Sequence, residues 1–320
     1  MAEVKDDGLT QIGGTAITPD VPIMGSGKKK SPSITVNDRA PTKISLNVAN
    51  GMDPTDVHKH YYVKLPHSNY EFEVRGLLVE EEDALKSANT SPKRAGDMIM
   101  KTFWNCISSD IKKPDHPFGR FDTFCKSISL ADRDALALAI CQETYGSTHD
   151  MIVTCSRCGK TFVDQVCLPE CIDLNIYHGP TPILQQRKVV ELPELGWKIY
   201  LKIPTVADEL ATLNTDSIDR NSKENISSRA SDYIFIDKIE FDDKTDTALN
   251  FSDTITNYIS IYGLIRKRPA IIRKLLAKEY ESFRGDWGIT AKHETTCKYC
   301  DSPIEVRIAP VSHFMFLCAN

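Results

Sequence analysis

Two Cys-x-x-Cys pairs, far apart in the chain, constrain its fold more than any other feature. The first pair is Cys155 and Cys158, and the second is Cys297 and Cys300. Zinc prefers four tetrahedral ligands, and a two-residue spacer lets both sulfurs of one turn reach a single ion. The four cysteines therefore predict one structural zinc per chain, completed only when folding brings the two pairs together. A closed site of this kind stabilises a fold and does not catalyse.

Strand-like sequence flanks both pairs, so each pair is predicted to lie in the turn of a β-hairpin. Polar and apolar residues alternate on either side of each turn, as in hairpins with one buried face. The four alternating runs are 151–154, 161–166, 293–296 and 304–308. Gly159 follows the first pair where a left-handed backbone is often required, and Asp301 holds the equivalent place in the second. The pattern predicts a zinc ribbon split between two distant segments.

Other uses of these cysteines are less well supported. A redox pair normally opens a helix beside a parallel sheet, which lowers its thiol pKa, whereas these pairs lie between antiparallel strands. Disulfides are disfavoured because no signal peptide is visible, and an intracellular origin is expected. A mixed ligand set that includes Cys167, Cys171 or His178 stays open. Four further cysteines have apolar neighbours and are predicted to be small core residues: Cys106, Cys125, Cys141 and Cys318.

Composition separates an N-terminal arm from the rest of the chain. Residues 1–57 are rich in Gly, Pro, Thr, Ser, Lys and Asp and lack aromatic residues, which predicts a flexible arm. Within it, the basic run 28–30 is expected to be solvated. The alternating run 43–50 either adds a strand to a partner's sheet edge or pairs within the chain's own fold. The net charge of −5 gives no hint of a nucleic-acid surface, and no run approaches the roughly 18 apolar residues of a membrane helix.

The remaining 263 residues predict an α+β fold. Residues 58–150 form a hairpin, at 61–66 and 70–75, followed by helices, one of them capped by Ser129. Three regions follow from the cysteine positions: 151–171, the first zinc knuckle; 172–290, a strand pair with a large, mostly helical insert; and 291–320, the second knuckle with a C-terminal docking segment. The last region contains the apolar end 314–317. That end either docks on a partner or folds onto its own core.

The insert itself begins with strands at 187–192 and 197–203 and then turns helical. Helices are predicted after Thr205 and at 226–239 and 254–264. A basic amphipathic segment starts at Arg266, and the acidic residues that follow favour a solvated face over an RNA or membrane surface.

The order of elements before the first cysteine pair carries a family resemblance. Its marks are a hairpin leading into Val79–Glu82, a helix with Asn105 and Cys106, the linker 118–124, and a helix running to Tyr145 and Gly146. This order resembles the baseplate hub subunit family of T-even-like contractile-tailed bacteriophages, over about residues 60–317. The resemblance implies a virion component of the tail baseplate, assembled in the host cytoplasm, that contacts other baseplate or tail proteins. The arm has no counterpart in that pattern, which favours an added attachment role.

The motifs of common enzymes are missing from the sequence. It has no Gly-rich phosphate loop, no His-Glu-x-x-His helix and no serine elbow, so a non-enzymatic protein is predicted. His58, His60 and His67 are expected to be surface imidazoles. The alternative function is a nucleic-acid-binding zinc ribbon, which would need a concentrated basic face. Five cations near the cysteine pairs could contribute to such a face: Arg157, Lys160, Lys292, Lys298 and Arg307. Cations at this place also balance the charge of a four-thiolate zinc.

Overall fold

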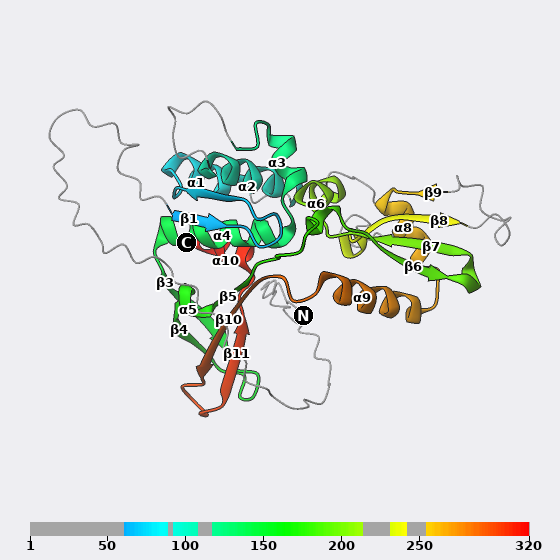
Figure 1. The fold of residues 1–320 in the computed structure, drawn as a ribbon. Coiled ribbons are helices and arrows are strands. Elements are labelled where there is room, and N and C mark those ends of the chain that lie inside the picture. The colour runs from blue at the N-terminus through cyan, green and yellow to red at the C-terminus, as the bar shows by residue number, and fades with distance from the viewer. Residues whose placement is uncertain (1–60, 89–91, 108–116, 214–230, 242–253, 320) are drawn as a thin grey trace, which may run out of the picture. The chain divides into compact units, whose positions relative to one another are not determined.

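A computed structural model describes residues 61–88, 92–107, 117–213, 231–241 and 254–319. The chain divides into two units, Met1–Asp53 and Pro54–Asn320, and all described residues belong to the second. The predictions for the arm, including the basic run and the alternating run, lie outside the described residues. Within the second unit, helices combine with small antiparallel sheets, which confirms the α+β class (Figure 1).

The N-terminal hairpin and its helices surround one central helix, and they form as predicted except that part of the predicted linker 118–124 is helical. Strands β1 (Tyr61–Lys64) and β2 (Glu71–Val74) pair antiparallel. The helices are α1 (Val79–Ala88), α2 (Pro92–Ile107), α3 (Phe121–Ser127) and α4 (Leu130–Tyr145). Ser129 and Asp132 form a reciprocal capping box that starts α4. Every residue from 135 to 141 in α4 is buried, so this helix is the centre of the largest core.

His67 corrects one prediction, because it is buried instead of lying at the surface. Only 3% of the residue is exposed, and its backbone N–H donates to Asp132 Oδ1 over 2.8 Å. Its ring Nε2 lies 3.2 Å from the carbonyl oxygen of Trp287. The turn of the first hairpin is therefore attached both to the start of α4 and to the chain just before the second knuckle. His58 and His60 lie outside the described residues.

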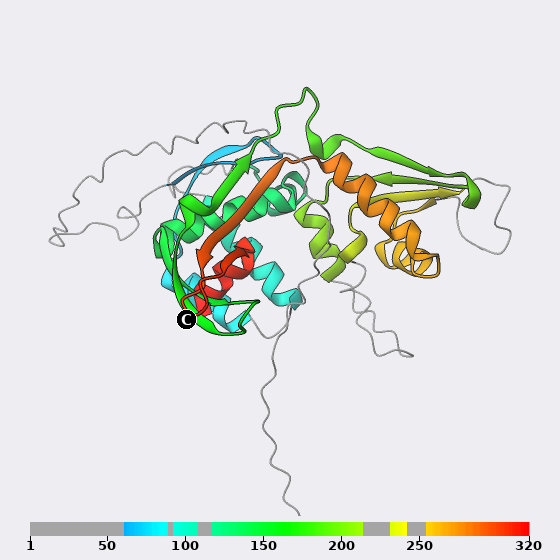
Figure 2. The ribbon, with the colours of Figure 1, turned by 90° about the horizontal axis from the view of Figure 1, so that it is seen from below.

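The C-terminal apolar segment folds onto the same core. It forms α10 (Pro310–Ala319), which packs against α4 (Figures 1 and 2). The Phe314 side chain is fully buried, and its ring centroid lies 5.2 Å from that of Phe103. Phe316 remains 44% exposed. The alternative in which this end packs on its own core is thus the one that the structure supports.

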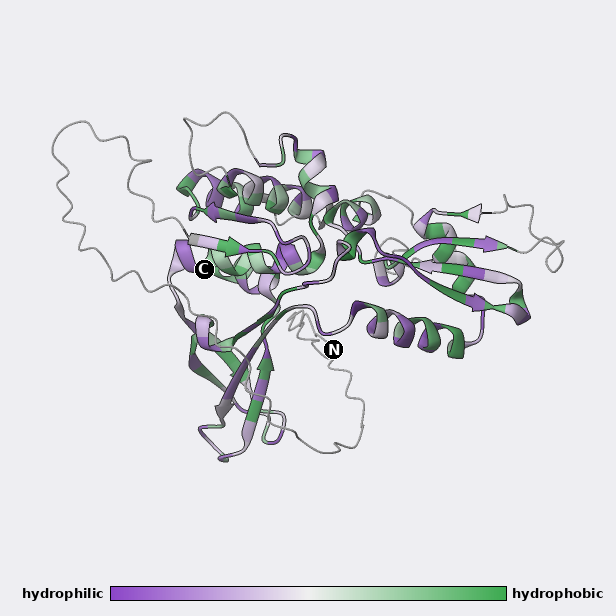
Figure 3. Ribbon diagram, viewed as in Figure 1, coloured by the Kyte–Doolittle hydropathy of each residue, from purple (hydrophilic) through white to green (hydrophobic). Residues whose placement is uncertain are grey.

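Two hairpins form the ribbon predicted around the cysteine pairs. The first consists of β3 (Thr148–Thr154) and β4 (Thr161–Cys167), followed by the short helix α5 (Leu168–Cys171). The second consists of β10 (Gly288–Thr296) and β11 (Pro303–Arg307), and β5 (Ile172–Asn175) pairs with the other edge of β10. Hydrophobic and hydrophilic residues alternate along these strands (Figure 3). The predicted strands on both sides of both turns are confirmed.

The segment between the hairpins contains a four-stranded antiparallel sheet as well as helices. The sheet order is β6 (Lys188–Leu192), β7 (Trp197–Leu201), β8 (Ile236–Phe241) and β9 (Thr254–Ile255). The helices are α6 (Val206–Leu213), α8 (Tyr258–Ile265) and α9 (Ala270–Arg284). Short 3₁₀ turns lie at Ile183–Gln185, Pro193–Leu195 and Ser231–Tyr233. The sheet, α8 and α9 enclose a second core that is separate from the core around α4.

The helix predicted over 226–239 is wrong for its described part, where β8 is a strand. Ile239 pairs with Ile199 and Lys238 with Tyr200, but the next pair, Leu201 with Ile236, skips Asp237. This β-bulge turns Ile236 and Ile239 toward the core although they are three residues apart. A three-residue spacing of buried residues is what a helix produces, and the bulge imitates it.

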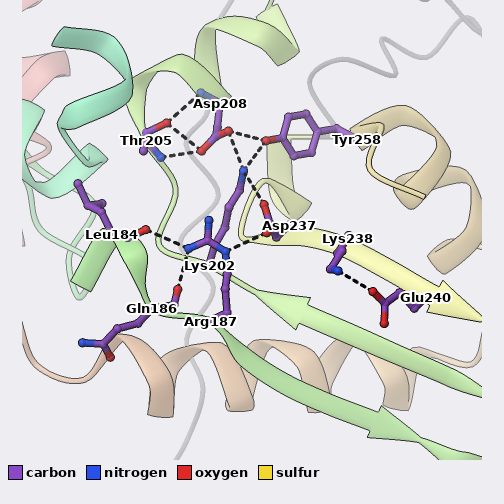
Figure 4. Close-up of polar contacts among 10 residues, drawn as sticks. All are labelled: Leu184, Gln186, Arg187, Lys202, Thr205, Asp208, Asp237, Lys238, Glu240 and Tyr258. Atoms are coloured by element: carbon purple, nitrogen blue, oxygen red, sulfur yellow. Dashed lines mark hydrogen bonds and ion pairs between the residues drawn. The ribbon is translucent and has the colours of Figure 1, made fainter. Parts of the chain in front are cut away.

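A partly buried polar cluster lies between the two cores (Figure 4). Lys202 follows β7, and its Nζ lies 2.8 Å from Asp208 Oδ1 in α6 and 2.9 Å from the Tyr258 hydroxyl in α8. Tyr258 donates to the same carboxylate over 2.6 Å, and the Thr205 backbone N–H donates to its other oxygen over 2.8 Å. Asp237, the bulge residue, lies 3.5 Å from Lys202 Nζ. Because its members are hydrogen-bonded to one another, the cluster fixes α6 against the sheet.

Candidate metal centre

The first cysteine turn is closed by its own backbone. The Cys155 N–H donates to the carbonyl of Lys160 over 3.0 Å, and the Gly159 N–H donates to the carbonyl of Cys155 over 2.8 Å. These bonds bend the chain so that Cys155 and Cys158 lie on one side of the turn. Gly159 has φ 72°, the left-handed conformation that the sequence predicts at this position.

The second cysteine turn repeats the same hydrogen bonds. The Cys297 N–H donates to the carbonyl of Ser302 over 2.9 Å, and the Asp301 N–H donates to the carbonyl of Cys297 over 3.0 Å. Asp301 has φ 54°, so it takes the place of Gly159, as predicted. The Tyr299 N–H also points to Cys297 Sγ, 3.5 Å away. Two distant segments thus fold into equivalent turns.

The four sulfurs come together between the two turns. Cys155 Sγ lies 3.8 Å from Cys300 Sγ, Cys158 Sγ lies 3.7 Å from Cys297 Sγ, and all four atoms lie within 4.8 Å of one another. Tetrahedral zinc with Zn–S bonds of about 2.3 Å separates its sulfurs by about 3.8 Å. A disulfide would need a sulfur separation of about 2.05 Å. The arrangement therefore fits a metal ion, and the cysteines that the sequence singles out could all reach it.

Hydrogen bonds favour the thiolate, the form that binds metals, at Cys300 and Cys155. The side chain and backbone of Ser302 lower the pKa of Cys300 to about 6. Ser302 Oγ lies 3.3 Å from Cys300 Sγ and accepts a hydrogen bond of 3.1 Å from Arg157, so its own hydrogen is free to point at the sulfur. Backbone N–H groups of Cys158 and Arg157 lower the pKa of Cys155. At Cys158 a backbone hydrogen bond at Lys160 acts to lower the pKa, but desolvation and the neighbouring thiols outweigh it and raise the pKa to about 11.

A small apolar core lies next to the four thiols. Val153, Phe162, Cys155 and Cys297 are buried in it, with Ile304 beside them. The core is smaller than the two others and is built from both hairpins. At their other ends both hairpins contribute to the largest core, Val166 from β4 and Ala291 from β10, so the cysteine cluster and this small core join them near the two turns.

The five cations near the cysteine turns make contacts within the ribbon. Lys298 Nζ donates to the carbonyl of Val163 over 2.5 Å, and Lys160 Nζ lies 4.7 Å from the centroid of the Tyr299 ring. Arg157 donates to Ser302 as described above. The other two cations share one acidic partner: Lys292 at 3.5 Å and Arg307 at 3.8 Å from Glu305. The contacts of Lys298, Lys160 and Arg157 join the two hairpins, whereas those of Lys292 and Arg307 lie within the second hairpin.

The alternative ligands lie away from the four-sulfur cluster. Cys171 Sγ is 3.8 Å from His293 Nδ1, whose Nε2 is 2.9 Å from Asp164 Oδ2. Cys167 and Cys171 line a pocket of about 550 Å³ together with His293. His178 is exposed. The structure therefore does not bring Cys167, Cys171 or His178 into the predicted site.

Among the described residues, one further group of side chains could hold a metal ion, and the sequence did not indicate it. Cys141, His149 and His313 are all buried, and one possible ligand atom from each lies within 4.8 Å of the others. The burial predicted for Cys141 is confirmed, as it is for Cys106, Cys125 and Cys318. The spacing of the three residues carries no signal because each comes from a different element.

Comparison with known proteins gives one match. A family model described as T4 bacteriophage base plate protein matches residues 58–262, which include the first cysteine pair and end before the second. No curated protein and no solved structure matches the chain. Among the described residues, no helix is both long and apolar enough to cross a membrane.

Proposed function

Since the chain belongs to the T4 bacteriophage base plate protein family and is a structural component of the phage tail baseplate, we propose that it acts through contacts with other baseplate or tail proteins, without catalysis. The match over residues 58–262 is the observation that carries this proposal. The likeness of its element order to hub subunits supports a place at the hub. We also propose that the protein is assembled into the tail in the host cytoplasm.

In this proposal, one structural zinc bound by Cys155, Cys158, Cys297 and Cys300 holds the ribbon together. Support comes from the sulfur separations of 3.7 and 3.8 Å, which match the edges of a zinc tetrahedron. Zinc bound in this way contributes its binding free energy to folding. It also ties together two segments that are separated by residues 159–296, so the ion fixes where the whole intervening segment begins and ends.

The outer face of the first hairpin is the surface that we propose for a neighbouring subunit. Ile152 and Val163 lie directly opposite each other in the β3–β4 register, and they are 62% and 53% exposed. The alternate residues Val153 and Phe162 point into the ribbon core, so the outward apolar pair has no role in that core. Burial of an exposed aliphatic side chain stabilises a contact by about 1.5–3 kcal/mol.

The test is incorporation of the protein into tails. A phage that lacks the gene is complemented with wild-type protein or with the double variant Ile152→Asp, Val163→Asp, and purified tails are quantified by mass spectrometry and electron microscopy. We expect wild-type protein in the tails and little of the variant, because two carboxylates oppose burial in the contact. Unchanged zinc content and melting temperature of the isolated variant serve as the control. Wild-type incorporation of a folded variant would remove this surface from the proposal.

A further inference from the structure

We propose that Cys141, His149 and His313 form a second metal site, which takes a divalent ion such as Zn²⁺. The three residues come from the last turns of α4, the start of β3 and the middle of α10. They are 0%, 6% and 8% exposed, and their ligand atoms lie within 4.8 Å of one another. One thiolate with two neutral imidazoles is a ligand set that suits zinc and its spectroscopic substitute Co²⁺.

The backbone sets His149 in the tautomer that a metal ligand needs. Its Nε2 lies 2.7 Å from the carbonyl oxygen of Gly146. A carbonyl only accepts hydrogen bonds, so Nε2 carries the hydrogen and Nδ1 keeps its lone pair. A ligating histidine commonly donates its second ring N–H to a backbone carbonyl in this way, which fixes the orientation of the ring.

The separation of the two imidazoles agrees with a shared ion. His149 Nδ1 lies 3.1 Å from His313 Nε2. Two nitrogens bound to one tetrahedral zinc at about 2.0–2.1 Å lie about 3.3–3.4 Å apart. Cys141 would bind as the thiolate and release its proton to solvent as the metal enters. The described residues contain no fourth Cys, His, Asp or Glu in the group, so the fourth position falls to a small ligand such as water.

The strand β3 connects this group with the four-thiol cluster. Side chains alternate along a strand, and the buried face of β3 carries His149 and Val153 and leads to Cys155. Six residues of strand at about 3.3 Å each place the two metal positions about 20 Å apart, so they are separate sites. On the other segment, Cys300 is followed by β11 and then by α10 with His313. The two sites would therefore fasten the same pair of segments at two points.

The experiment measures metal content of the full chain, purified after growth with zinc. We expect about two zinc ions per wild-type chain and about one after His313→Gln or Cys141→Ala. Cys125→Ala is the matched control, because it removes a buried thiol that belongs to neither group and should leave both ions bound. The Co²⁺ spectrum of the four-thiolate site should be unchanged in His313→Gln, which also shows that the variant is folded.

Other outcomes decide against one site or the other. A wild-type count of one ion that His313→Gln leaves in place overturns the second site, and the 3.1 Å contact is then an N–H···N hydrogen bond between the two rings. A count of one that His313→Gln abolishes and Cys155→Ser leaves unchanged supports this site and counts against the four-thiol site. If His313→Gln does not fold, titration of the wild-type apoprotein with Co²⁺ decides: two spectrally distinct steps support the proposal, and a single four-thiolate step contradicts it.

Discussion

Cys158 Sγ lies 3.7 Å from Cys297 Sγ, although the chain between them includes a four-stranded sheet and its helices. Chain connectivity alone does not keep these two sulfurs together, because the intervening segment has its own core. The contact is made by two equivalent turns whose backbone hydrogen bonds are the same. A metal ion bound between them, as proposed above, would add its binding free energy to this small junction.

Replacement of Cys297 by serine should remove one bound zinc per chain. A structural zinc site contributes directly to folding, so we expect the melting temperature to fall together with the zinc content. Elemental analysis and thermal unfolding measure the two quantities. Cys106→Ser, at a buried cysteine outside both metal groups, is the control and should keep its zinc. Undiminished zinc in Cys297→Ser would contradict a site shared by both hairpins.

Removal of zinc by a chelator should loosen the ribbon and leave the sheet of the intervening segment folded. The ribbon core is small, whereas β6–β9 enclose a core of their own. Hydrogen exchange followed by mass spectrometry should therefore accelerate in β3, β4, β10 and β11 and change little in β7 and β8. Added zinc should restore the protection. Equal acceleration in β7 and β8 would show that the two regions unfold as one unit.

Lys202→Met should destabilise the protein strongly. Lys202 and Asp208 form a largely buried pair, with 11% and 16% of their side chains exposed, and loss of Lys202 leaves the Asp208 charge inside the protein without its cation. Such a loss costs about 3–5 kcal/mol. Lys198→Met on the neighbouring β7 strand is the matched control: its partner Glu191 is 3.9 Å away and both side chains are more than half exposed, so the cost is about 0–1 kcal/mol. Chemical denaturation measures both, and equal effects would contradict the prediction.

Acid should weaken the same cluster, in a way that depends on Asp208. Burial acts to raise the pKa of Asp208, but the hydrogen bond and charge of Lys202 outweigh it and hold the pKa below its ordinary value of 3.8. A lowered folded-state pKa means that this contribution to stability is complete above pH 3.8 and is lost as the pH falls through the folded-state value. Asp208→Asn should be less stable at neutral pH and lose less stability on acidification. Parallel pH profiles for both proteins, from denaturation at several pH values, would contradict this role.

The protein should bind DNA and RNA weakly even at low salt. The cations around the cysteine turns contact partners within the ribbon, among them Lys298 with Val163 and Lys160 with Tyr299. Fluorescence anisotropy with labelled duplex and single-stranded oligonucleotides measures the affinity. Tight binding that falls steeply with rising salt would revive the nucleic-acid-binding function, because counterion release produces that dependence.

Local patterns in the sequence were enough to place much of this fold. Alternation around both cysteine pairs predicted all four ribbon strands, and the positions of Gly159 and Asp301 predicted their left-handed conformations. The Ser129 cap and the helix after Thr205 were equally readable. These features depend on a few neighbouring residues, whose propensities and hydrogen bonds act over one turn or one strand.

Features that depend on contacts between distant residues could not be predicted from the sequence. The bulge at Asp237 gave β8 a helix-like spacing, and only its pairing with β7 shows the strand. His67 is buried because its backbone N–H donates to Asp132 and its ring Nε2 lies beside the Trp287 carbonyl. Both partners are far from it in the sequence. Sequence spacing contains no record of such partners.

The two candidate metal sites differ in whether the sequence alone could predict them. The spacing of Cys155, Cys158, Cys297 and Cys300 was sufficient to nominate a four-thiolate site, because each half of it is a local turn. Cys141, His149 and His313 have no such spacing, and only the packing of α10 against α4 and the contact of His313 with His149 in β3 bring them together. A site whose halves are local turns can be predicted from the spacing of residues, because each turn depends only on its neighbours. A site assembled from three separate elements forms only when the cores pack.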